Sequence, residues 1–264
     1  MLYPRLIPSL LVNDKQELVK TICFNNRNYL GEPLNTAYIF SGFEADELLV
    51  LDIDASKNKK CISLDFVKSL STFTKVPLTV GGGISNLDQI YEILSLGVER
   101  ITLSSALNDD FRLLYKAANS YGSSSLSVIV NTFRNNSGEL MACFGRPEFS
   151  RKFYPIDELC KKCEDSGAGE LIINQIDHEG TRKGFDINLM QDLNEKVSIP
   201  LVALGGCGSK EHISDLLKRT PISGISCGSF FVYAPKTSQV LLSYTNTSNW
   251  LKENFNQFKD NYQI

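Results

Sequence analysis

Histidine is scarce in this 264-residue sequence, which contains only His178 and His212. Imidazole-rich metal centres and Ser-His-Asp systems are therefore poorly supplied. No apolar run approaches the roughly 18 residues of a membrane span, and the first residues do not resemble a signal peptide. A formal charge of −3 gives no electrostatic reason to expect nucleic acid or an anionic membrane as a partner. We expect a cytoplasmic protein with no metal ion and no cofactor.

The seven cysteines are odd in number and show no disulfide-framework spacing, which is typical of a reducing compartment. Two of them, Cys160 and Cys163, form a C-x-x-C within DELCKKCEDSG. That stretch has a helical pattern and no second ligand pair nearby. The spacing therefore indicates two small residues one helical turn apart rather than a zinc site.

The sequence repeats itself with an offset of 123 residues. ELLVLDID at 47–54 aligns with ELIINQID at 170–177, and VPLTVGGGIS at 76–85 aligns with IPLVALGGCG at 199–208. The same offset brings SSA at 104–106 opposite CGS at 227–229. A match that persists over several segments indicates two halves of one architecture.

Short apolar runs alternate with amphipathic stretches in both halves, as expected for parallel strands buried on both faces and connected by helices. Eight such units predict a single (β/α)8 TIM barrel domain over residues 1–264, built from two duplicated half-barrels. A doubly wound open sheet is the alternative, but it requires a reversal of strand order that a copied half does not supply. The predicted strands are 5–11, 48–53, 77–81, 100–104, 125–131, 170–174, 200–204 and 223–227.

Function in such barrels collects on the loops that follow the carboxyl ends of the strands. Two glycine turns there, one in each half, stand beside small hydroxyl residues. Glycine lets backbone N–H groups approach an anion closely, and a helix N-terminus favours its negative charge. We therefore predict two phosphate sites on opposite sides of the barrel mouth, formed by Gly82, Gly83, Ser104 and Ser105 in one half and by Gly205, Gly206, Gly228 and Ser229 in the other.

Several longer segments, among them RLIPSLLV, VPLTVGGGI and SGAGELIINQIDHEGTRKGFD, resemble the cyclase subunit of imidazole glycerol phosphate synthase, over about residues 1–235. The resemblance implies a phosphate-binding barrel that receives ammonia through its core from a glutaminase subunit docked at the N-terminal barrel face. It adds Gly180 to the phosphate contacts and places Lys20 on a mobile first loop.

The resemblance also exposes a departure. The cyclase uses two aspartates, one closing the first strand and one closing the fifth, as general acid and base. Those places hold Leu11 and Asn131 here. Neither side chain exchanges a proton near pH 7, and loss of such a group typically costs about 10²- to 10⁴-fold in rate. Asp52 and Asp177 remain at strand ends and are the remaining catalytic candidates.

Four charged residues at the starts of strands match the family's gate for ammonia: Arg5, Glu47, Arg100 and Glu170. A purely structural ring of ion pairs is the alternative, since buried charges need partners. A chain that keeps the gate but lacks the cyclase acids suggests that ammonia still moves through it.

One branch of the family fits better. NRNYLGEPLNTAYIFSGFEADELLVLDI and the leucine at position 11 resemble barrel subunits of surface-polysaccharide synthesis, in which ammonia converts an N-acetyl group into an acetamidino group. That resemblance implies a phosphorylated or nucleotide-linked sugar and a separate ATP-dependent amidotransferase. The alternatives are a true histidine-pathway cyclase that uses Asp52 or Asp177, and a non-catalytic scaffold that binds a phosphorylated ligand and activates a partner.

Two further segments carry expectations about structure alone. Residues 133–153 follow the fifth strand and predict a short hairpin over the mouth, with NNSGE as its turn. The segment after Phe231 contains an aromatic amphipathic pattern around Trp250 and Phe255, which predicts the last barrel helix.

Overall fold

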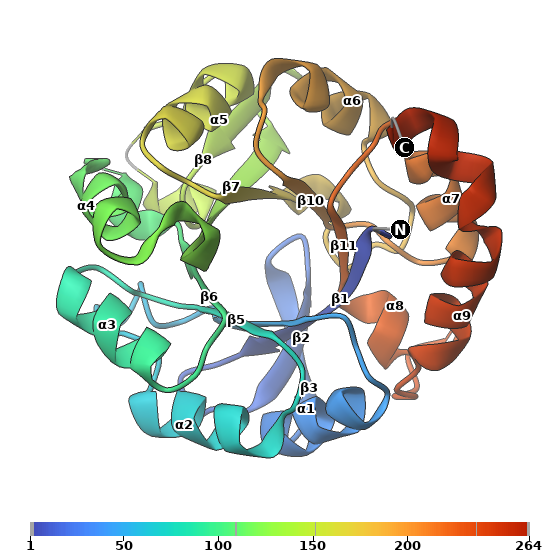
Figure 1. Ribbon diagram of the computed structural model, residues 1–264, viewed down its shortest axis with the longest axis horizontal. Helices are drawn as coiled ribbons and strands as arrows, with labels where there is room; N and C mark the ends of the chain where they lie inside the picture. Colours follow the sequence, from blue (N-terminus) through green and yellow to red (C-terminus); the bar gives the residue numbers. More distant parts are fainter. Residues whose placement is uncertain (1–2, 109, 151, 236, 263–264) are drawn as a thin grey trace.

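A computed structural model describes residues 3–108, 110–150, 152–235 and 237–262. Eight parallel strands form a closed barrel, because β1 pairs with both β4 and β11 (Figure 1). Around the barrel the order is β1, β4, β5, β6, β7, β9, β10 and β11. The strands are β1 (Arg5–Val12), β4 (Leu48–Asp52), β5 (Leu78–Gly81), β6 (Arg100–Leu103), β7 (Leu126–Arg134), β9 (Glu170–Gln175), β10 (Leu201–Leu204) and β11 (Gly224–Cys227).

The predicted TIM barrel is confirmed, and the eight predicted strands coincide with the eight barrel strands. The ends differ by a residue or two, except that β7 runs three residues further, to Arg134. The repeat is also visible in space. The strand that carries ELLVLDID and the one that carries ELIINQID occupy equivalent places, four strands apart around the barrel.

Helices form the outer ring of the barrel (Figure 1). Several begin at a residue whose side chain accepts an N–H of the first turn, including Ser63, Asn86, Asp186 and Ser209. Each buries one apolar face against the strands. They are α1 (Pro33–Gly42), α2 (Leu64–Phe73), α3 (Leu87–Ser95), α4 (Arg112–Tyr121), α5 (Ile156–Asp165), α6 (Ile187–Lys196), α7 (Lys210–Leu217), α8 (Ser229–Val232) and α9 (Thr245–Asn254).

Apolar side chains form two separate clusters, one outside the barrel and one inside it. Alternate strand residues such as Leu6, Leu48 and Val50 pack outward against the helices. The residues between them point to the barrel axis, where a small cluster consists of Ile7, Leu49, Ile129, Ile172, Val202 and Leu204, with Leu51 packed against it. The interior is therefore layered, as expected for this fold.

Two hairpins project from the carboxyl end of the barrel. One consists of β2 (Leu18–Ile22) and β3 (Asn25–Gly31). In this hairpin β2 also pairs antiparallel with the last two residues of β1. The other joins the end of β7 to β8 (Leu140–Cys143), which confirms the hairpin predicted within 133–153. The first hairpin was not predicted, because the resemblance implied a mobile loop there.

The C-terminal segment packs on the outside of the barrel, as predicted. Trp250 lies in α9, and Phe255 begins a final 3-10 turn, η5 (Phe255–Tyr262). Phe255 is fully buried against Tyr3 and Phe258. Among the helices of the described residues, none is long and apolar enough to cross a lipid bilayer.

Candidate functional site

A cavity of about 530 Å³ opens at the carboxyl ends of the barrel strands. Its floor lies inside the barrel at Gly81, Thr102 and Ser226, and its rim reaches the two hairpins. The lining includes all nine residues proposed above as phosphate contacts: Gly82, Gly83, Ser104, Ser105, Gly180, Gly205, Gly206, Gly228 and Ser229.

The two glycine turns lie on opposite sides of this cavity. One follows β5 and the other follows β10, and three strands lie between β5 and β10 on either side of the barrel. Gly83 and Gly206 both have positive φ, and a Cβ there would approach the carbonyl oxygens of Lys60 and Gly184 to 1.8 and 2.0 Å. Within the described residues, the backbone N–H groups of Gly83, Gly206 and Gly228 donate to no protein acceptor. We call these two turns, each with its serines, the first and second anion cradles.

The serines of the first cradle already make protein contacts. Ser104 Oγ donates to the carbonyl of Ile129 at 3.0 Å and accepts the N–H of Gly145 at 3.0 Å. Ser105 Oγ shares a hydrogen bond with Ser56 Oγ at 2.7 Å. Ser104 therefore mainly attaches the β7–β8 hairpin, and a ligand at this cradle would meet backbone N–H groups and the Ser105 hydroxyl.

Lys20 is the cation at the centre of the second cradle. Its side chain comes from β2, is only 3% exposed, and donates from Nζ to the carbonyl of Ser9 at 2.6 Å. The amine is so close to Gly228 that a Cβ there would lie 2.3 Å from Nζ. Burial lowers the pKa of Lys20 to about 8, although Glu179 opposes the shift.

The two aspartates proposed as catalytic candidates occupy different environments. Asp52 lines the cavity, and its Oδ1 accepts the backbone N–H groups of Asp54 and Ala55 at 3.0 and 2.9 Å. Burial raises its pKa, and these two hydrogen bonds oppose the rise. Asp177 does not belong to the cavity lining. It is exposed, and its Oδ2 accepts the backbone N–H of Arg134 at 2.7 Å.

Asp177 follows β9 at the carboxyl end of the barrel but is not among the residues that line the cavity, and its catalytic role stays a prediction. Its carboxylate binds the backbone of Arg134, the last residue of β7. The acid that the sequence analysis overlooked is Glu179, which is buried and lines the cavity. It accepts the hydroxyl of Thr21 at 2.9 Å and the N–H of Phe24 at 3.1 Å, so it fixes the β2–β3 hairpin.

The two places of the missing cyclase acids are both at the cavity. Leu11 and Asn131 line it. Leu11 pairs with Val19 of the hairpin. Asn131 is 4% exposed and donates from Nδ2 to the carbonyl of Gly145 at 2.6 Å. The first side chain has no proton to exchange, and the second is engaged in holding the β7–β8 hairpin.

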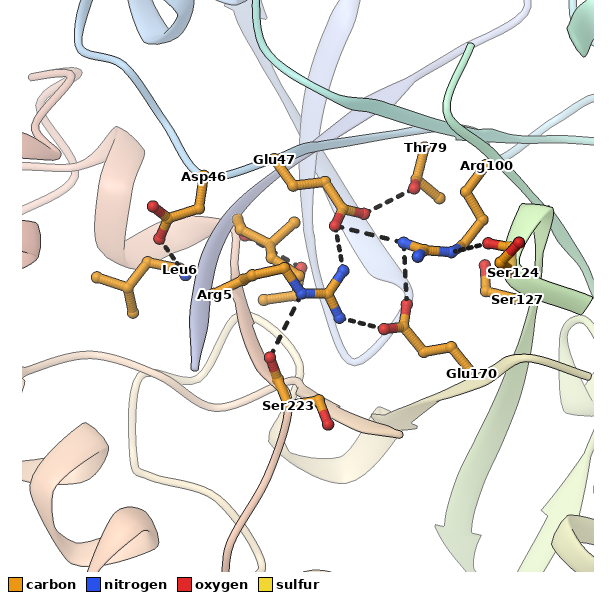
Figure 2. A network of polar contacts seen from close by, with 12 residues as sticks. Arg5, Leu6, Asp46, Glu47, Thr79, Arg100, Ser124, Ser127, Glu170 and Ser223 are labelled. Carbon is orange, nitrogen blue, oxygen red and sulfur yellow. Dashed lines mark hydrogen bonds and ion pairs between the residues drawn. The ribbon is translucent and has the colours of Figure 1, made fainter. Parts of the chain in front are cut away.

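At the opposite end of the barrel the four predicted gate residues form a ring (Figure 2). Arg5 donates to both Glu47 and Glu170. Arg100 Nη1 lies 3.5 Å from Glu47 and 3.6 Å from Glu170, so each cation contacts each anion. Thr79 adds a hydrogen bond of 2.6 Å to Glu47.

Burial governs the electrostatics of this ring. Glu47 and Glu170 are 3% and 2% exposed, and burial raises the pKa of Glu170 while Arg5 and Arg100 oppose the rise. The ring balances two positive and two negative charges, so that each buried carboxylate lies beside two cations. On β6, Arg100 of the ring lies two residues, about 7 Å, before Thr102 of the cavity floor. On the strands of the other three ring residues, the cavity lining begins four residues after the ring.

Unpartnered polar atoms lie along the interior from the ring to the mouth. Three of the four buried side-chain atoms without a hydrogen-bond partner, within the described residues, face the axis. They are Thr102 Oγ1 at the cavity floor, Asn174 Oδ1 above it, and Glu170 Oε1 in the ring, which makes the 3.6 Å ion pair with Arg100 but no hydrogen bond. Such atoms are rare in folded proteins, and each calls for a partner. A small molecule with N–H or O–H groups would satisfy them.

The C-x-x-C lies in α5, in helical geometry as predicted, and both thiols are buried. Burial raises the pKa of Cys160 to about 12, so this thiol is far from its metal-binding thiolate form. Among the residues that the structure describes, no cluster of three His, Cys, Asp or Glu side chains has the geometry of a metal site.

Comparison with known proteins places the chain in a family. The model of the family described as "Histidine biosynthesis protein" matches residues 5–237. A Leptospira borgpetersenii protein provisionally named imidazole glycerol phosphate synthase subunit HisF is 39% identical over 249 residues, covering 93% of this chain and 96% of that protein. A Vibrio vulnificus protein with the provisional subunit name hisF3 is 35% identical over 248 residues, 94% of this chain and 95% of the relative. The subunit HisF of Hydrogenobaculum sp. is 31% identical over 249 residues, 94% and 98% respectively.

Proposed function

The chain belongs to the histidine biosynthesis protein family, as a HisF-like subunit, and within that family we propose that it conducts ammonia for amidine formation on a sugar. In this proposal a glutaminase docks at the N-terminal face and releases ammonia into the barrel. The ammonia converts the N-acetyl group of a phosphorylated or nucleotide-linked sugar into an acetamidino group for surface polysaccharide. A separate ATP-dependent amidotransferase performs the condensation.

The observation that carries the proposal is the contrast between a complete gate and missing acids. The four ring charges are all present and mutually paired. At the mouth, Leu11 has no titratable group and Asn131 is bonded to Gly145. Ring closure to an imidazole needs proton transfers at these places, whereas ammonia conduction needs only the passage.

The interior supports passage of a small neutral molecule. Uncharged aliphatic side chains such as Ile7, Leu49 and Val202 pack between the ring and the cavity, and Thr102 and Asn174 offer unpartnered acceptors at the cavity. Ammonia has three N–H donors and can use each acceptor in turn.

The experiment that tests the proposal uses the purified barrel with ammonium and the phosphorylated cyclase intermediate of the histidine pathway. We expect no imidazole glycerol phosphate to form. A reference cyclase subunit with both aspartates serves as the positive control under the same conditions. Turnover by this chain at a comparable rate would contradict the proposal.

A genuine cyclase is the second candidate, and one observation favours it. Asp52 lines the cavity with a carboxylate whose pKa is raised by burial, which is the direction expected of a general acid. The Asp52→Asn variant, measured in the cyclase assay described above, distinguishes the genuine cyclase from the ammonia-conducting subunit. If activity is present and this variant abolishes it, Asp52 has taken over the chemistry. A third candidate, a non-catalytic scaffold, predicts that a phosphorylated ligand stimulates the glutaminase while no ammonia reaches a sugar.

A further inference from the structure

Three polar groups form a chain of hydrogen bonds above the cavity floor. The carbonyl oxygen of Gly145 accepts Nδ2 of Asn131 at 2.6 Å, and Oδ1 of Asn131 accepts Nδ2 of Asn174 at 2.8 Å. The chain ends at Asn174 Oδ1, which has no protein partner among the described residues. Asn174 is 6% exposed and lines the cavity.

The carbonyl of Gly145 fixes the donor-to-acceptor direction of both hydrogen bonds. A backbone carbonyl can only accept, so Asn131 must present its amide nitrogen to Gly145 and its oxygen to Asn174. Asn174 must then present its nitrogen, and its oxygen is left for the cavity. Rotating either amide would place two like atoms against each other. Gly145 is itself anchored, because its N–H donates to Ser104 Oγ.

The free oxygen lies between the two anion cradles. Asn174 is in β9, and β7 and β9 are the strands that separate β6 of the first cradle from β10 of the second. Aliphatic residues of the interior cluster, Ile129 and Leu204, also line the cavity. A buried acceptor without a donor costs about 1–3 kcal/mol. A ligand held by both cradles would pass over this oxygen and could supply the donor.

We propose that Asn174 Oδ1 is a specificity-determining contact that accepts a hydrogen bond from a neutral O–H or N–H group in the middle of a ligand with an anionic group at each end. The inference rests on the ligand class of the proposed function, and it does not depend on ammonia. An amide oxygen adds no charge between two ligand phosphates, unlike the aspartate that the cyclase has next to it at position 131. A ligand without a central donor leaves the oxygen buried and unpaired, and is therefore rejected.

Two bisphosphates of similar reach test this inference. Fructose 1,6-bisphosphate has hydroxyl donors between its phosphates, and hexane-1,6-diol bisphosphate has none. Isothermal titration of the full chain should give about tenfold tighter binding of the sugar, the effect of one buried hydrogen bond. In Asn174→Leu, which has a similar volume and no acceptor, that preference should disappear.

The controls separate a specific contact from a damaged fold. Asn131→Leu combined with Asn174→Leu removes both amides together, so that no Asn131 oxygen is left unpaired, and it should abolish the preference equally. Asn188→Leu, on the exposed face of α6, should keep the wild-type preference. Circular dichroism confirms that each variant is folded.

Each outcome decides a different point. Equal affinity of the wild type for both bisphosphates, or an unchanged preference in Asn174→Leu, would overturn the inference and leave the proposed ammonia conduction standing. Failure of both bisphosphates to bind the wild type would overturn the two-cradle ligand class and this inference with it. Ammonia conduction is measured by the cyclase and transfer assays, so its failure is seen separately.

Discussion

The two ends of the barrel use charge in opposite ways. At the N-terminal end, Arg5 and Arg100 pair with Glu47 and Glu170 so completely that each charge contacts both opposite charges. At the mouth, Lys20 donates to the backbone carbonyl of Ser9 and forms no ion pair within the described residues. The charges of the ring are therefore neutralised within the ring, whereas the charge of Lys20 at the mouth is left for an anionic ligand.

The largest expected effect is at the ring. Arg5→Ala leaves two buried carboxylates with only Arg100 at 3.5 and 3.6 Å, so the free energy of unfolding should fall by about 3–5 kcal/mol. Urea denaturation measures the loss. In complex with a glutaminase, the same variant should hydrolyse glutamine without passing ammonia onward.

The control is another arginine-to-alanine change. Arg112 is 84% exposed and pairs with Asp110 on the surface, so Arg112→Ala should cost less than about 1 kcal/mol. If Arg5→Ala is as mild as this control, then the ring is not the buried network described here.

At the mouth the expected effect is on anion binding. Lys20→Met should weaken sulfate binding about tenfold to a hundredfold, because a charge-assisted hydrogen bond is lost from a buried site. Sulfate is the probe because it remains a dianion over the whole pH range. Titration calorimetry at pH 7 gives both affinities.

The pH dependence sharpens this prediction. With its pKa lowered to about 8 by burial, Lys20 is cationic below pH 8 and loses its charge as the pH rises above it. Sulfate affinity of the wild type should therefore fall between pH 7.5 and 9.5, and that of Lys20→Met should stay flat. A wild-type affinity that is constant to pH 10 would show that Lys20 does not hold the anion.

A smaller effect is expected where a cyclase acid is reintroduced. Asn131→Asp replaces the N–H that Gly145 accepts with an oxygen, so stability should fall by about 1–3 kcal/mol, as seen in thermal unfolding. No cyclase activity should appear, since the other acid position still holds Leu11, whose side chain has no ionisable group.

A matched control lies in the same hairpin. Asn135 Oδ1 accepts the backbone N–H groups of Ser137 and Glu139, and a carboxylate can do the same. Its Nδ2 donates to the exposed Glu139 side chain at 3.2 Å, a contact in high dielectric that contributes little. Asn135→Asp should leave stability nearly unchanged. An equal loss in both variants would mean that the amide donor at position 131 has no special role.

The smallest expected effect concerns the β2–β3 hairpin that carries Lys20. Arg27 holds the hairpin to the barrel with two hydrogen bonds of 2.6 Å to Asp54. Because this pair is partly exposed, Arg27→Ala should cost about 1 kcal/mol or less globally, while proteolysis within 13–31 becomes faster. Lys15→Ala in the same segment is the control and should not change the cleavage rate. An unchanged cleavage rate in Arg27→Ala would contradict the prediction and show that other contacts hold the hairpin.

The barrel itself could be predicted from the sequence because its strands are apolar on both faces and recur with one offset. The β2–β3 hairpin could not, since NNRNYLG is polar and exposed, and its order comes from distant partners such as Glu179 and Asp54. The same holds within the site. The strand ends located the glycines of both cradles, but the directions of Asp177 and Asn131 depend on Arg134 and Gly145 of the second hairpin.

The most direct test of ammonia conduction follows the nitrogen. The barrel, its glutaminase and the amidotransferase are supplied with ATP, an N-acetylated nucleotide sugar, glutamine labelled with 15N in its side-chain amide, and an excess of unlabelled ammonium. The account predicts that the acetamidino product carries mostly 15N, and that Arg5→Ala loses this enrichment. A product whose label matches the bulk ammonium pool in the wild type, or no transfer to the sugar at all, would contradict it.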